Sequence, residues 1–179
     1  MPIAERAVLL DPLSVLPRMN LGIIHYLSHD FAAAEVEFRR VLAMQPGFAR
    51  AKVFLSGTLT LQKRHDEAIE VARELIAESG RVPIYLWALG ISYAHAGRMS
   101  EARELLEPLN QTSFPALYRA ISHLVLGETD RVFPTLEEAI AQRSDWMYPL
   151  GRQPLLRHLY GDPRFEAIVR SLRLPPSPE

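Results

Sequence analysis

Residues of one kind recur every 34 positions along this chain, and this period constrains the fold more than any other feature. Three alanines and three leucines keep the interval: Ala34, Ala68, Ala102, Leu21, Leu55 and Leu89. Pro12 and Pro46 are also 34 residues apart. A period of about 20 to 50 residues is typical of proteins that stack copies of one small structural unit. The sequence therefore predicts a repeat array.

Each period contains two helical patterns separated by a turn. Apolar residues recur at steps of three and four, and the pattern breaks near Ser28–Asp30, Lys63–Arg64 and Gly97–Arg98. The predicted first helices span 14–28, 48–62, 83–96 and 113–126, and the predicted second helices span 31–44, 66–78, 99–109 and 130–142. Each unit is therefore expected to be a helical hairpin.

Residue size at equivalent positions predicts how the two helices of a hairpin meet. Gly22 and Gly90 occupy the same place in two first helices. Because glycine costs about 1 kcal/mol in a helix interior, its presence there indicates a close approach that a Cβ would obstruct. Large residues expected to fill the space between adjacent hairpins are Phe38, Leu106 and Leu136, with Ala72 as an exception.

The two ends of the chain depart from the regular repeat. Residues 4–12 have the same phase as residues 39–46, so the chain is expected to begin inside a second helix, as a piece of a longer protein. The fourth hairpin is degenerate, and Pro134 predicts a kink or a late start of its second helix. Asp162-Pro163 predicts the beginning of a helix near 163–172, in a tail that covers the open end of the array.

The order Leu-Gly, Tyr, Gly-Arg and Glu-Ala-Arg in residues 89–103 resembles the tetratricopeptide repeat family, and the resemblance extends across residues 4–142. The segment from Gly127, with Trp146 and Asp162–Phe165, is similar to the C-terminal ends of tetratricopeptide regions in bacterial transcription regulators and adenylate cyclases. The resemblance implies an all-α, right-handed superhelix of helical hairpins with a C-terminal helical cap. It also implies a regulatory or scaffolding role.

The resulting division of the chain has two parts. An array over residues 1–145 is expected to contain a half repeat at 3–12, repeats at about 13–46, 47–80 and 81–112, and a degenerate repeat at 113–143. A C-terminal cap and tail would follow at 146–179. The apolar face of residues 3–10 would be uncovered, which predicts self-association, for example as a homodimer.

Composition argues against several classes of partner. The 20 Lys and Arg residues are balanced by 21 Asp and Glu, which gives a formal net charge of −1 and no footprint for nucleic acid. The longest stretch free of Asp, Glu, Lys and Arg, residues 82–97, is shorter than the roughly 20 residues of a membrane helix. The absence of cysteine fits a reducing cytoplasm. We therefore expect a cytoplasmic protein with no direct nucleic-acid or membrane contact.

In the family, the first helices line a concave groove, and spacings of three and four place its contact positions on one stripe of each helix. The candidate partner-binding residues are Leu16, Met19, Asn20, Ile23, Arg50, Val53, Phe54, Ile84, Trp87, Ile91, Leu117 and Ile121. This mostly apolar stripe suits an amphipathic helix or an extended apolar peptide better than a charged chain terminus. The alternative is that these residues are core, or are covered by the chain's own tail or a second copy.

No residue pattern in the sequence predicts catalysis, a metal site or a cofactor. His25 and His29 have the spacing of a metal-binding pair, but no third ligand is evident. The sequence therefore predicts a non-catalytic module that binds a protein or peptide, as the C-terminal regulatory or scaffolding segment of a larger bacterial signalling or transcription protein. One alternative is a free-standing adaptor for an apolar peptide, and another is an undetected hydrolase or transferase that uses His25 or His123.

Overall fold

The computed structural model describes residues 3–111, 113–141 and 150–172, and these residues form helices and connecting turns without any strand. The α-helices are α1 (Ile3–Leu10), α2 (Val15–Leu27), α3 (Phe31–Met44), α4 (Ala49–Leu61), α5 (His65–Ser79), α6 (Pro83–His95), α7 (Met99–Asn110), α8 (Ala116–Val125), α9 (Thr129–Ala141) and α10 (Pro163–Ser171). Two 3-10 helices, η2 (Leu150–Arg152) and η3 (Pro154–Leu159), precede α10.

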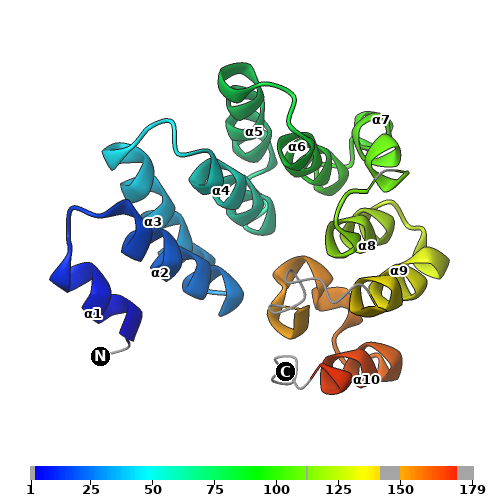
Figure 1. Ribbon diagram of the computed structural model, residues 1–179. Helices are drawn as coiled ribbons and strands as arrows, with labels where there is room; N and C mark the ends of the chain where they lie inside the picture. The colour runs from blue at the N-terminus through cyan, green and yellow to red at the C-terminus, as the bar shows by residue number, and fades with distance from the viewer. Residues whose placement is uncertain (1–2, 112, 142–149, 173–179) are drawn as a thin grey trace.

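Successive helices pair into hairpins that stack along a curved array (Figure 1). The first helices α2, α4, α6 and α8 lie along the inner side of the curve, and their partners lie outside them. The observed helices coincide closely with those predicted from the 34-residue period. The largest difference is at α8, which begins at Ala116 rather than 113, because Pro115 occupies the N-cap and disfavours a helical conformation at Phe114.

All four hairpins turn through the same backbone conformation. The second residue after each first helix has a positive φ: His29 (62°), Lys63 (64°), Gly97 (76°) and Gly127 (77°). The next amide then donates to a carbonyl five residues earlier: Asp30 to His25, Arg64 to Leu59, Arg98 to Tyr93 and Glu128 to His123, at 2.8–3.0 Å. This bond is the one that closes a Schellman cap. The repeat thus preserves the turn geometry even where the residue is not glycine.

The close approach predicted inside the hairpins is present. A Cβ on Gly22 would lie 2.5 Å from Phe38 Cε1, and a Cβ on Gly90 would lie 2.7 Å from Leu106 Cδ2. Four residue pairs separated by 16 positions occupy this place: Gly22 and Phe38, Ser56 and Ala72, Gly90 and Leu106, Ala120 and Leu136. All eight are buried. A small residue on the first helix is therefore constant, whereas the size of its counterpart varies.

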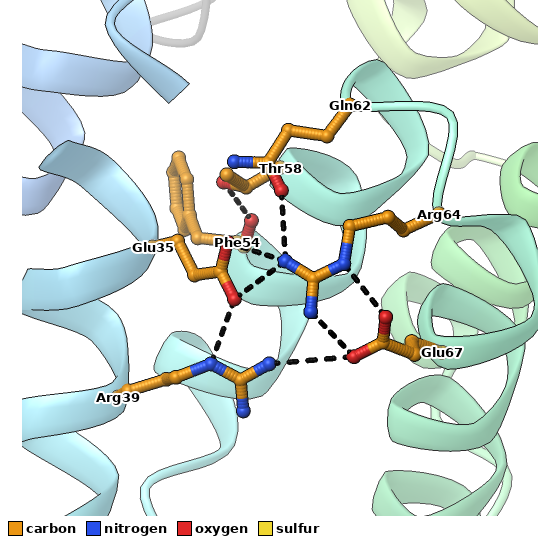
Figure 2. A network of polar contacts seen from close by, with 7 residues as sticks. All are labelled: Glu35, Arg39, Phe54, Thr58, Gln62, Arg64 and Glu67. Atoms are coloured by element: carbon orange, nitrogen blue, oxygen red, sulfur yellow. Dashed lines mark hydrogen bonds and ion pairs between the residues drawn. The ribbon is translucent and has the colours of Figure 1, made fainter. Parts of the chain in front are cut away.

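An ion-pair network joins the first two hairpins, as Figure 2 shows. The Arg64 guanidinium donates to both oxygens of Glu67 at 2.6 Å and, through its third nitrogen, to Glu35 at 2.7 and 2.8 Å. Arg39 donates to Glu35 at 2.8 Å. Burial alone would raise the pKa of the Glu35 carboxyl, but hydrogen bonds from Arg39, Arg64 and Gln62 outweigh burial and lower that pKa. The network fixes neighbouring hairpins by multidentate contacts.

Helix α9 starts at Thr129, so the late start expected from Pro134 is wrong. Pro134 is the sixth residue of α9. Its missing N–H would have bonded the Asp130 carbonyl, so one early hydrogen bond is lost and the helix continues to Ala141.

The chain beyond α9 returns to the inner side of the array (Figure 1). The 3-10 helices lie within the curve, and α10 packs against α9. Helix α10 covers residues 163–171, with Pro163 in its first turn and an Asp162 side chain that accepts from the Arg164 amide at 2.8 Å. Leu156 of η3 and Phe165 of α10 are fully buried. The tail thus contributes buried side chains to the core of the array, in addition to covering its last hairpin.

Candidate functional site: the concave face

The predicted partner-binding stripe divides into an open part and a closed part. The exposed residues are Leu16, Asn20 and Arg50. The half-buried residues are Ile23, Val53, Phe54 and Ile84. The buried residues are Met19, Trp87, Ile91, Leu117 and Ile121. The open half is defined as the stripe residues of α2 and α4 that are exposed or half-buried: Leu16, Asn20, Ile23, Arg50, Val53 and Phe54. Most stripe residues of α6 and all those of α8 are buried.

The tail explains why the closed part is buried. Leu150, Leu155, Leu156 and Leu159 of the 3-10 helices join one apolar cluster with residues of α6 and α8. Trp87, predicted to be a partner anchor, is only 6% exposed, and its indole N–H donates to the Tyr118 carbonyl at 3.0 Å. These positions match the alternative that the apolar stripe is covered by the chain itself.

One polar contact links the tail to the opposite end of the concave face. The Tyr26 hydroxyl of α2 donates to the Gln153 side-chain oxygen at 3.3 Å. Burial raises the pKa of Tyr26, so this hydroxyl stays protonated and available as a donor. This hydrogen bond thus joins the first hairpin to the tail, across 127 positions of sequence.

A small cavity remains beneath the tail. Its volume is about 70 Å³, and its wall is formed by α2, α4, α6 and α8 together with Gln153 and Leu155. The aromatic side chains on this wall are Tyr26, Phe54, Trp87 and Tyr118. Cavities of this chemistry accept apolar groups rather than ions.

Histidine and arginine side chains gather where the 3-10 helices meet the concave face. The His29 ring lies 6.0 Å from the Tyr160 ring, and its buried Nε2 has no hydrogen-bond partner among the described residues. Burial lowers the pKa of His29; a hydrogen bond with the Arg152 backbone opposes this shift, and the charges of Arg157 and Arg152 add to it. Burial also lowers the pKa of His95, which faces His65, Arg157 and His158. Protonation of His29 and His95 at low pH would therefore add positive charge close to Arg152 and Arg157 of the tail.

The histidines singled out in the sequence do not form a metal site in the part of the chain that the structure describes, where no group of three suitable ligands occurs. His25 faces Asp30 at 3.7 Å, whereas the His29 ring stacks on Phe31. His123 Nδ1 lies 2.7 Å from Glu128 and belongs to the turn of the fourth hairpin.

The buried serine hydroxyls are structural. Ser92 Oγ lies 3.0 Å from Ser56 Oγ and 3.1 Å from Thr60 Oγ1, and it also donates to the Ala88 carbonyl. All three hydroxyl-bearing residues are buried between α4 and α6. Their hydrogen bonds remain inside this cluster or go to the backbone, as buried polar groups require.

Comparison with known proteins agrees with this geometry. Residues 19–83 match the tetratricopeptide repeat family. This segment is therefore similar to tetratricopeptide repeats. The repeat fold also superposes on a thermophilic tetratricopeptide protein of Thermus thermophilus, with a TM-score of 0.59, 19% identity and coverage of 88% of this chain and 89% of that one. It superposes on YrrB, a tetratricopeptide protein with an unusual peptide-binding site, with a TM-score of 0.53, 12% identity and coverage of 94% and 90%.

A sequence relative has a similar segment within a much longer chain. The chloroplastic PsbB mRNA maturation factor Mbb1 of Chlamydomonas reinhardtii is 41% identical over 78 residues, which are 43% of this chain. The match spans only 12% of that relative. Among the described residues, no helix is long and apolar enough to cross a membrane.

Sequence reasoning missed the tail residues that contact the concave face: Gln153, Leu155 and Leu156. A signal for them does exist, because Gln153–Leu159 combines an initiating proline with three leucines. That pattern indicates a short apolar turn, but it does not indicate which surface the turn contacts.

Proposed function

We propose that the chain is a non-catalytic protein-interaction module whose partner contacts the open half of the concave face. In this proposal it is the C-terminal regulatory or scaffolding segment of a larger bacterial, cytoplasmic signalling or transcription protein. The repeat fold supports an interaction role, and the matching segment of the algal relative lies within a longer chain.

The observation that carries the proposal is that the predicted stripe exposes both an apolar residue, Leu16, and a cation, Arg50. Leu16 is 58% exposed, and the guanidinium carbon of Arg50 lies 5.9 Å from the Phe54 ring centroid. An amphipathic or extended apolar segment that carries a carboxylate fits this chemistry, because apolar contact and charge pairing are available together.

Contact with nucleic acid is not part of the proposal. Several arginines along the hairpin turns are paired with glutamates, including Arg64 with Glu67, Arg98 with Glu101 and Arg103 with Glu107. Phosphate binding needs cations that are available for counterion exchange, and these pairs would have to break first.

Site-specific photo-crosslinking tests the proposal in cells. A photoreactive amino acid replaces Leu16 or Arg50, and a matched variant carries it at Val36 on the outer helix α3, which is 47% exposed. We expect a common protein adduct from positions 16 and 50 that is absent from position 36. The proposal is wrong if the inner positions give no adduct, or if position 36 gives the same one.

A further inference from the structure

We infer that the tail conceals a second docking surface on the concave face, and that the ligand of this surface is a short leucine-rich turn of the kind that the tail itself provides. This inference rests on the proposed function, because it assigns partner chemistry to the same face. The tail segment is defined as residues 150–160, which include η2, η3 and Tyr160.

The seated tail segment shows which chemistry the surface accepts. Leu156 is fully buried, and Leu155 and Leu159 are 5% and 9% exposed. Gln153 adds one amide oxygen, which accepts from Tyr26 at 3.3 Å. Leu155 lies in a wall shared with α4, α6 and α8, whereas Leu159 lines a hollow with residues of α8 and α9. The surface therefore accepts a leucine-rich turn that carries one hydrogen-bond acceptor.

The fit between the tail segment and the concave face is incomplete. A cavity of about 70 Å³ remains between them, and only Gln153 and Leu155 of the tail reach its wall. The stabilisation lost to unfilled apolar space grows with its volume, so a ligand with a larger apolar side chain in place of Leu155 would bind roughly tenfold more tightly than the tail sequence. The tail is thus a replaceable occupant of the surface.

The polar contacts between the tail segment and His29 are also incomplete. His29 Nε2 is buried without a hydrogen-bond partner among the described residues. Besides burial, the charge of Arg157 lowers the pKa of His29, whereas a hydrogen bond with the Arg152 backbone raises it, and both arginines are exposed. A ligand that offers an acceptor to His29 Nε2, or lacks the Arg157 side chain, would remove these unfavourable features.

Covalent attachment explains how an imperfect occupant keeps the surface closed. A segment attached to its own binding site is present at an effective concentration on the order of millimolar. A free peptide at micromolar concentration therefore competes poorly with the intact tail. Weakening the tail inside the full chain should expose the surface to the peptide.

Fluorescence polarisation with the full-length chain tests this competition. The probe is a fluorescein-labelled synthetic peptide of residues 150–160, and a control peptide carries Leu155→Ser and Leu156→Ser. The chain variants are Gln153→Ala, which removes the acceptor for Tyr26, and Leu156→Ala, which removes a buried side chain. Leu75→Ala on the outer helix α5 is the matched control for general destabilisation, because Leu75 is buried but lies away from the tail.

We expect Leu156→Ala to raise peptide affinity at least tenfold over the wild type, and Gln153→Ala to raise it about threefold. Leu75→Ala should leave the affinity unchanged, and the serine peptide should not bind any variant. If Leu156→Ala fails to fold, Gln153→Ala still decides the question. Equal affinity in the wild type and the tail variants, absence of binding, or equal binding of the serine peptide would overturn the inference, whereas the proposed function is judged separately by the crosslinks from Leu16 and Arg50.

Discussion

Alanine at Gly22 and at Gly57 should change stability in opposite directions, although both glycines lie inside first helices on the concave side. A Cβ at Gly57 would have Tyr26 Oη as its nearest neighbour at 3.7 Å, which is ordinary contact at the edge of the cavity under the tail. The helix would gain about 1 kcal/mol from replacing glycine by alanine. We therefore expect Gly57→Ala to raise the free energy of unfolding by about 1 kcal/mol.

Gly22→Ala adds the same helix propensity but meets a rigid neighbour. The new Cβ would lie 2.5, 2.8 and 3.1 Å from three atoms of the Phe38 ring, which is fully buried. Overpacking of this kind costs about 1 to 3 kcal/mol, and three contacts with an aromatic ring favour the upper end. After the propensity gain, the expected net loss is about 2 kcal/mol.

Urea unfolding followed by far-ultraviolet circular dichroism measures both changes against the wild type. The expected gap of about 3 kcal/mol between the two variants corresponds to about 6 to 12 °C in melting temperature for a chain of this size. Gly22→Ala combined with Phe38→Leu should recover part of the loss, because the smaller side chain can move away. The packing argument is refuted if Gly22→Ala is as stable as Gly57→Ala.

Three further results are expected. Because His29 and His95 have lowered pKa values in the folded chain, the unfolded chain binds more protons as the pH falls below about 6.5, and the melting temperature should be lower at pH 5 than at pH 7.5. The His29→Asn variant, whose asparagine tolerates the positive φ, should reduce this difference in melting temperature. An unchanged difference would exclude a role for His29. Deleting residues 150–179 should lower the melting temperature by about 10 °C or more, since four fully buried apolar side chains are lost, and an unchanged melt would make the tail an appendage. Leu10 and Leu13 are 77% and 86% exposed, so replacing both with serine should abolish concentration-dependent self-association in sedimentation velocity, and a wild type that stays monomeric at high concentration would contradict the expected homodimer.

The repeat architecture could be predicted from sequence because its determinants are local and occur several times. The alanines of the second helices, the glycines at close approach and the turns near Asp30 and Gly97 each mark the same place in successive hairpins. Several weak local signals with one period therefore reinforce one another. The positive φ of His29 and Lys63 could not be read from residue type, since neither is glycine, but it follows once the turns are aligned with Gly97.

The position of the tail could not be predicted in the same way. The contact between Tyr26 and Gln153 joins residues 127 positions apart, and the tail segment occurs once, so no period reports its location. Its leucines indicate burial but not a partner surface. For the same reason, the sequence identified Trp87 and Ile91 as members of the concave stripe without showing that the chain itself covers them.

The most direct test of this account is a nuclear Overhauser measurement between the Tyr26 ring and the Gln153 side-chain amide. A mixture of isotope-labelled and unlabelled chains distinguishes contact within one molecule from contact between two. The structure predicts an intramolecular cross-peak between these groups, whose oxygens lie 3.3 Å apart. Absence of that cross-peak in a chain whose hairpins are fully helical would contradict a tail seated on the concave face.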